Sequence, residues 1–92
     1  MNETEDAVLR IIDEHERWLL GTEHPGGRHL TEPDIDAILK SRHPELHDPE
    51  SMHSLVRVLT GLVGRGLLDA EHLPGEPFST YWLTEAGRTA VE

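Results

Sequence analysis

Apolar residues recur at helical intervals through the first 20 positions of the chain, with charged residues between them. This spacing predicts a first helix over about residues 3–20, ended at Gly21. Asn2 and Glu5 lie three residues apart, which is the spacing of a capping box at a helix start. The predicted apolar stripe consists of Val8, Ile11, Ile12, His15 and Leu19.

A proline and paired glycines predict a loop over residues 22–28, and residues 28–30 are expected to form a short first strand. Thr31 then caps a second helix, with Asp34 three residues on. This helix ends before Pro44, because the residue preceding a proline disfavours helical backbone angles. Its apolar face consists of Ile35, Ile38 and Leu39.

The third predicted helix carries the most continuous apolar stripe. Asp48 is expected to cap it, with Pro49 at its first position. Leu46 is expected to tuck inward just before it, and Gly64 and Gly66 end it. The stripe spans four turns and consists of Met52, Leu55, Val56, Leu59, Leu62 and Val63.

A β-hairpin and a last helix follow. Residues 67–72 and 78–83 are typical of two strands, separated by a turn too rich in proline to be paired. Thr84 is expected to cap a final helix. Residues 1–92 are therefore expected to form a single domain, mainly α with a small β-hairpin.

The closing run Tyr81-x-Leu83-Thr84-Glu85-x-Gly87-Arg88 and the Gly66-Leu67-Leu68 step before the hairpin carry a family resemblance. With this order of elements, residues 5–90 resemble winged helix-turn-helix transcriptional regulators. The nearest types are PadR and MarR and the small haloarchaeal or archaeal phage-repressor-like proteins. The resemblance implies a winged helix-turn-helix fold and regulation through DNA binding. It implies a structural role for the closing run, with Tyr81 and Leu83 on the last strand.

The charge of the chain opposes that function on average. There are 18 acidic residues against eight basic ones, of which Lys40 is the only lysine, and the formal net charge is −10. A polyanion such as DNA is repelled by this average. Residues 28–68 are nearly neutral, with six acidic and five basic residues, so DNA binding is expected there if anywhere.

An acidic composition with almost no lysine resembles the proteins of salt-accumulating archaea. Near 1 M salt the Debye length is about 3 Å, so surface repulsion is screened. We therefore hypothesise a protein that acts in a high-salt cytoplasm. A cytoplasmic location also fits residues 1–6, which lack the basic region of a signal peptide, and the absence of any apolar run of about 20 residues.

The face of the third helix opposite its apolar stripe is expected to contact DNA bases in the major groove. Arg57 can bond guanine bidentately, and Glu50 can accept from cytosine. The candidate base contacts are Glu50, His53, Ser54, Arg57 and Gly61. The candidate contacts to the DNA backbone are Arg28, Lys40, Arg42 and Arg65. The alternative is that these are ordinary solvated residues.

The predicted wing argues against strong DNA binding. Residues 69–77 include Asp69, Glu71 and Glu76 but no arginine or lysine. This favours an alternative function, a winged-helix protein–protein interaction module whose acidic surface binds a basic partner without contacting DNA.

A homodimer through the first helix is expected, because Leu9, Trp18 and Leu20 cannot all face one core. Trp18 is the expected anchor, since tryptophan is enriched at interface hot spots. The alternative is that Trp18 packs over its own domain.

No metal, cofactor or enzymatic activity is expected. One short segment holds four potential metal ligands: His43, Glu45, His47 and Asp48. Pro44 prevents a helix from carrying both histidines on one face, so a solvated turn is expected instead of a metal site. The chain has no cysteine for a nucleophile, a disulfide or a thiolate site. It also lacks a Gly-rich phosphate loop.

The high-salt hypothesis predicts that KCl stabilises the protein. Raising KCl to about 1 M should screen the repulsion among carboxylates and raise the melting temperature. A gain of about 1 kcal/mol corresponds to roughly 4–8 °C for a domain of this size. Thermal melting followed by circular dichroism measures this, and a melting temperature that is already maximal without salt would contradict the hypothesis.

Overall fold

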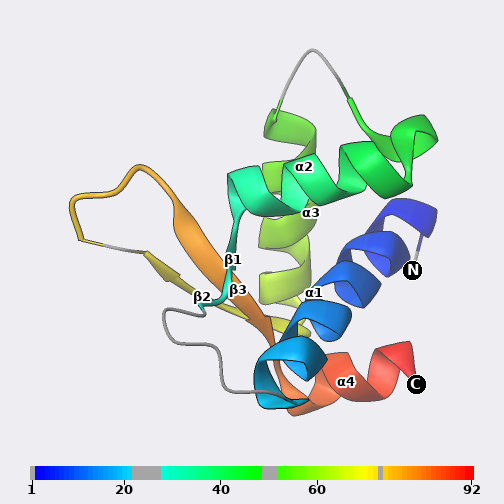
Figure 1. Ribbon diagram of the computed structural model, residues 1–92, viewed down its shortest axis with the longest axis vertical. Coiled ribbons are helices and arrows are strands. Elements are labelled where there is room, and N and C mark those ends of the chain that lie inside the picture. The colour runs from blue at the N-terminus through cyan, green and yellow to red at the C-terminus, as the bar shows by residue number, and fades with distance from the viewer. Residues whose placement is uncertain (1, 22–27, 49–51, 73) are drawn as a thin grey trace.

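The computed structural model describes residues 2–21, 28–48, 52–72 and 74–92, and it shows four helices and a three-stranded antiparallel sheet (Figure 1). This is the predicted fold class, a winged helix-turn-helix that is mainly α with a small sheet. The elements are α1 (Glu3–Gly21), β1 (Leu30–Thr31), α2 (Glu32–Arg42), a 3-10 turn η1 (Pro44–Leu46), α3 (His53–Gly64), β2 (Leu68–His72), β3 (Ser79–Leu83) and α4 (Glu85–Val91). No described helix is long and apolar enough to cross a membrane.

β3 is the central strand of the sheet, in the order β1-β3-β2. It pairs with β2 from Leu68 opposite Leu83 to His72 opposite Ser79. The β2–β3 hairpin projects beyond the helices and forms the wing (Figure 1). β1 adds two pairs on the other edge of β3, so the sheet joins the start of α2 to the end of α3.

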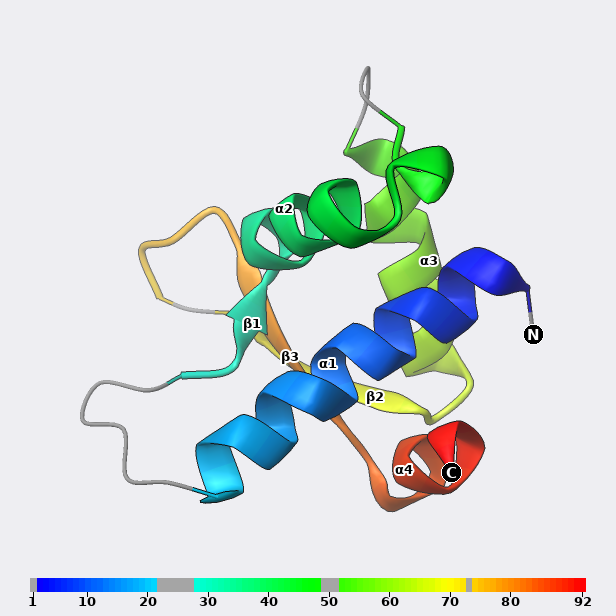
Figure 2. The same cartoon turned by 45° about the vertical axis from the view of Figure 1, so that its right-hand side comes forward.

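The core lies where α1 crosses the molecule, with α2 on one side of it and α4 on the other (Figure 2). The apolar residues of α1, α2, α3 and β3 supply most of this core. The largest fully buried side chains are Leu9, Ile12, Ile35, Leu59, Leu62, Leu68 and Val8. The prediction that Leu9 belongs to a dimer interface was therefore wrong, because its side chain is 0% exposed and packs inside the core.

The predicted caps at the starts of α1 and α2 are confirmed. The Glu5 N–H donates to Asn2 Oδ1 at 2.8 Å, and the Asn2 N–H donates back to Glu5 Oε1 at 3.1 Å. Asp34 Oδ2 accepts from the Thr31 N–H at 3.1 Å and from its hydroxyl at 2.9 Å. These bonds satisfy donors that a helix start otherwise leaves unpaired.

The predicted start of the third helix was wrong. α3 begins at His53, with Met52 at the cap position, and Pro49 lies outside the described residues. Asp48 accepts a hydrogen bond from the Ser54 hydroxyl at 3.1 Å instead of capping a helix that starts beside it. Met52, expected in the apolar stripe, is 37% exposed because it precedes the helix.

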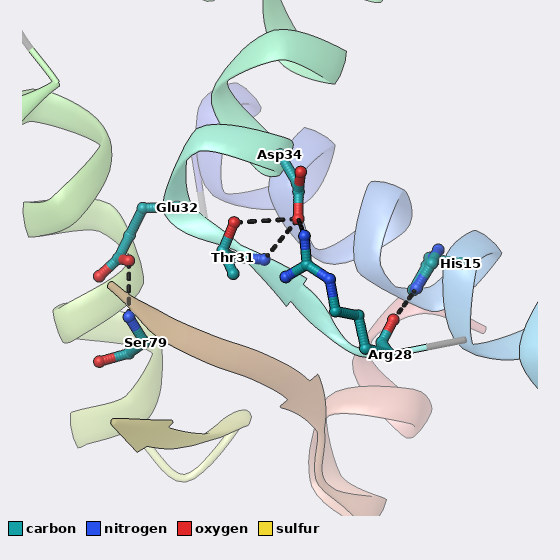
Figure 3. A network of polar contacts seen from close by, with 6 residues as sticks. All are labelled: His15, Arg28, Thr31, Glu32, Asp34 and Ser79. Carbon is teal, nitrogen blue, oxygen red and sulfur yellow. Dashed lines mark hydrogen bonds and ion pairs between the residues drawn. The ribbon is translucent and has the colours of Figure 1, made fainter. Parts of the chain in front are cut away.

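The first strand lies slightly later than expected. β1 holds Leu30 and Thr31 and not residues 28–30, because only these two residues face partners on β3. The Arg28 carbonyl accepts a hydrogen bond from His15 Nε2 on α1 at 2.6 Å (Figure 3). His29 Nδ1 bonds the largely buried Glu16 at 2.7 Å and its ring stacks on Trp82, with centroids 4.8 Å apart.

α4 is fixed by contacts to the segment that follows α3. The Thr84 hydroxyl accepts from the Gly87 N–H at 3.1 Å and donates to the Gly66 carbonyl at 2.5 Å. Gly66 has a φ of 76°, which favours glycine. A Cβ on Gly87 would lie 2.0 Å from the Leu67 carbonyl oxygen, so only glycine fits where α4 meets this backbone.

Gly87→Ala should therefore destabilise the fold even though alanine favours helix formation. Overpacking of this kind costs about 1–3 kcal/mol of unfolding free energy. Gly61→Ala is the matched control on α3, where a Cβ would meet no described atom within 4 Å. That control should gain roughly 0.5–1 kcal/mol from helix propensity. Urea denaturation measures both, and equal effects of the two alanines would contradict the close packing at Gly87.

Glu32 connects the first turn of α2 to β3. Its Oε2 accepts from the Ser79 N–H at 2.8 Å (Figure 3), and its Oε1 accepts from the Tyr81 hydroxyl at 2.9 Å. Tyr81 is only 6% exposed. Burial, and then the hydrogen bond to Glu32, raise the pKa of Tyr81 above its usual value. The carboxylate thus holds the helix-turn-helix against the sheet.

Tyr81→Phe should lower the free energy of unfolding by about 1–3 kcal/mol at neutral pH, because Glu32 loses a buried donor. Since the pKa of Tyr81 is raised by folding, its contribution is complete below about pH 10, the usual tyrosine pKa, and falls as pH rises above it. The wild-type chain should lose stability there more steeply than Tyr81→Phe. Tyr81 is the only tyrosine, so tyrosinate absorbance reports it directly, and ionisation near pH 10 in the folded protein would contradict this account.

Candidate nucleic-acid interface

α3 packs through one face and exposes the other. Leu55, Leu59 and Leu62 are buried in the core. On the opposite side, His53, Arg57 and Gly61 are exposed and lie four residues apart. Ser54, beside His53, is exposed too, although its hydroxyl is engaged with Asp48. Four of the five predicted base contacts therefore share the solvent side of α3, and Glu50 lies outside the described residues.

α3 differs from the other helices in charge. Its 12 residues from His53 to Gly64 include no aspartate or glutamate, although the chain has 18. α1, α2 and α4 each carry acidic residues in their first turn. Arg57 therefore projects from a helix without carboxylates, and within the described part of the chain no carboxylate pairs with it.

The exposed side of α3 is also low in bulk. Gly61 and Gly64 lie on it with Thr60, and a Cβ at either glycine would meet no described atom within 4 Å. Of these two exposed glycines, Gly61 lies inside the helix and weakens it by about 1 kcal/mol relative to alanine. Both glycines also let another molecule approach the helix backbone closely. Thr60 and Gly64 were absent from the predicted site, although a helical wheel places them beside Arg57 and Gly61.

The predicted backbone-contacting cations are mostly paired with carboxylates. Arg42 forms a two-pronged ion pair with Glu14 on α1, with one N–O distance of 3.1 Å, and this lowers the pKa of the Glu14 carboxyl through the hydrogen bond and its charge. Arg65 forms an ion pair with Glu5 at the start of α1. Lys40 is exposed on α2. Arg42 and Arg65 would have to leave these partners to reach a phosphate.

Arg28 lies between the helix-turn-helix and the wing. Its guanidinium is 3.5 Å from Asp34 and its side chain is 61% exposed (Figure 3). A hollow of about 440 Å³ adjoins it, lined also by Pro33 of α2 and by Glu76 and Phe78 of the wing. Phe78 is 36% exposed, and sequence patterning assigned it only to a strand. Arg28 is thus the cation best placed between α2 and the wing.

The wing carries negative charge, as expected from the sequence. Asp69, Glu71 and Glu76 are all exposed. Asp69 lies opposite Trp82 in the hairpin register, and Glu71 opposite Thr80. A phosphate would be repelled by this surface unless salt or cations intervened.

The histidines near η1 have acidic partners. His47 Nε2 lies 2.9 Å from Asp36 Oδ1 and its side chain is 9% exposed. His43 Nδ1 lies 3.6 Å from Glu45. Across the described residues, no three His, Asp or Glu side chains come together as a metal-binding group. These pairs connect η1 to α2 and leave the potential ligands dispersed.

Comparison with known proteins supports the fold. No protein-family model and no curated protein sequence matches the chain. It is similar to a crystal structure from Ralstonia eutropha JMP134, of a protein to which DNA binding has been provisionally assigned, with 21% sequence identity and a TM-score of 0.67. The match covers 99% of this chain and 93% of that chain. At this identity the likeness shows a shared fold alone.

Proposed function

We propose that the chain is a single winged-helix domain that regulates transcription by binding double-stranded DNA, with α3 in the major groove. The observation that carries the proposal is the acid-free, exposed face of α3 around Arg57 in a chain of net charge −10. A polyanion is repelled by carboxylates, so a helix that binds one is expected to carry none on the face that makes the contact.

In this proposal Arg57 reads a guanine, because a guanidinium can bond its O6 and N7 together. His53 and Ser54 reach neighbouring base edges or phosphates from the first turn of the helix. Gly61 lets the helix backbone approach the groove wall. Glu50, just before the helix, would accept from a cytosine amino group.

Arg28 and Lys40 are proposed as phosphate contacts that position α2 on the duplex. Few phosphate contacts and an acidic wing give weak binding with a shallow salt dependence. This suits the high-salt cytoplasm proposed from the composition. Two half-sites bound by a homodimer would compensate for the weakness of one, since two recognition helices then enter successive turns of the groove.

A second candidate function is a protein–protein interaction module. The exposed Asp69, Glu71 and Glu76 of the hairpin favour it, because they present carboxylates to a basic partner where a DNA-binding wing needs cations. The same DNA experiment separates the two functions.

Selection from a pool of random duplexes should enrich a defined sequence with the wild-type chain. Arg57→Ala should weaken binding to that sequence by about 10- to 100-fold and relax the preference at one base pair, because a bidentate base contact is worth roughly 1–3 kcal/mol. Gel-shift titration at fixed salt measures both.

Arg10→Ala is the matched control. Arg10 is exposed on α1 and pairs only locally, with Asp6 one helical turn away at 2.9 Å, so the variant makes the same change in net charge away from α3. Its affinity should stay close to wild type. Failure of the wild-type chain to enrich any sequence would overturn the DNA-binding proposal and favour the interaction module.

A further inference from the structure

Two hollows that share lining residues lie between α1 and α2. These helices are neighbours that cross at an angle (Figures 1 and 2). One hollow has a volume of about 330 Å³ and the other about 410 Å³. Both are lined by His15, Trp18 and Ile38. Ile11 extends the first hollow and Ala37 the second, so an apolar groove follows the α1–α2 seam.

Trp18 stands at this groove and is 50% exposed. Its ring stacks on His15, with centroids 5.5 Å apart. His15 is in turn held by the Arg28 carbonyl at 2.6 Å (Figure 3). The fixed imidazole of His15 therefore restricts the orientation of the Trp18 ring. This restriction reduces the conformational entropy that is lost when a partner covers the ring.

The charges around the groove cancel. Glu14 is paired with Arg42 at one rim, and Asp34 with Arg28 at the other. Elsewhere the surface is acidic, as in the first turn of α1 and along the wing. Two copies of a chain with net charge −10 repel each other over most orientations. This neutral face keeps like charges from lying directly opposite each other in the contact, so it lowers the repulsion between two copies.

We infer that the α1–α2 groove is the surface through which two copies of this chain pair, with Trp18 of each copy seated in the groove of the other. A protruding aromatic ring and the hollow beside it on one face are the elements of a self-complementary, two-fold interface. Tryptophan in an apolar pocket with charged residues at the rim is the usual composition of an interface centre.

Of the three residues that the sequence predicted for the dimer interface, only Trp18 lines this groove. Leu9 is buried in the core. Leu20 is 76% exposed but lies two residues from Trp18, about 200° around the helix, and so faces away from the groove. The inference rests on the proposed homodimer, and none of the residues that line the two hollows belongs to α3.

Sedimentation equilibrium of the full chain without DNA tests the inference. The wild type should sediment at twice the chain mass of 10.4 kDa. Trp18→Ala and Ala37→Glu should each raise the dimer dissociation constant by about tenfold or more, the first by removing the anchor and the second by placing a charge in the groove. Ala37 is exposed, so its variant tests the groove without disturbing the core.

Two matched variants serve as controls. Leu20→Ala truncates an exposed apolar side chain on another side of α1, and Ala86→Glu adds the same charge at an exposed position of α4. Both should sediment as the wild type does. Circular dichroism melts verify that each variant is folded.

A monomeric wild type, or a dimer that both Trp18→Ala and Ala37→Glu leave intact, would overturn the inference. Loss of the dimer in Trp18→Ala alone would also overturn it, because the indole would then act outside the groove. None of these results decides whether Arg57 reads DNA, since that test scores sequence preference and this one scores mass.

Discussion

The other elements depend on the position of β3. This strand lies between β1 and β2, and it is also bonded to the carboxylate of Glu32. Its inward residues Tyr81 and Leu83 are buried against the helices. One edge pairs with the hairpin strand β2, and the other receives β1 and, through Glu32, the first turn of α2. α2 follows β1 and α3 precedes β2, so the two helices are attached to strands on opposite edges of β3. The placement of α2 relative to α3 therefore depends on β3. The exposed face of α3 is a consequence of that placement.

Acidic residues of α1 bond basic side chains from other parts of the fold. Glu5 and Glu14 engage Arg65 and Arg42, and Glu16 engages His29. These contacts hold α1 to the end of α3, to α2 and to the segment before β1. Arg57 projects from the one helix without carboxylates. An acidic protein can in this way keep a locally cationic helix, because its excess negative charge is placed on other elements.

Features set by neighbouring residues were predictable from the sequence. The caps at Asn2 and Thr31 and the position of the hairpin strands depend on contacts within a few residues. The structure confirms the caps, and it confirms the strands to within one residue at their starts. The burial of Leu9 was missed, since α1 is covered on more sides than a single stripe implies. The pairing of Arg42 with Glu14 joins residues 28 positions apart, which no helical wheel reveals. The candidate reading face was predictable because periodicity alone places it opposite the core. What binds there is a property of charges brought together by folding.

The double role of Thr84 limits which amino acids that position can accept. A helix cap alone is served by serine, threonine, aspartate or asparagine. Here the same oxygen accepts from Gly87 and its proton goes to the Gly66 carbonyl. Aspartate could accept the first bond but, when ionised, would set its charge against that carbonyl. Only a hydroxyl performs both tasks with one atom. Only serine could therefore replace Thr84 during evolution and keep the end of α3 bonded to the start of α4.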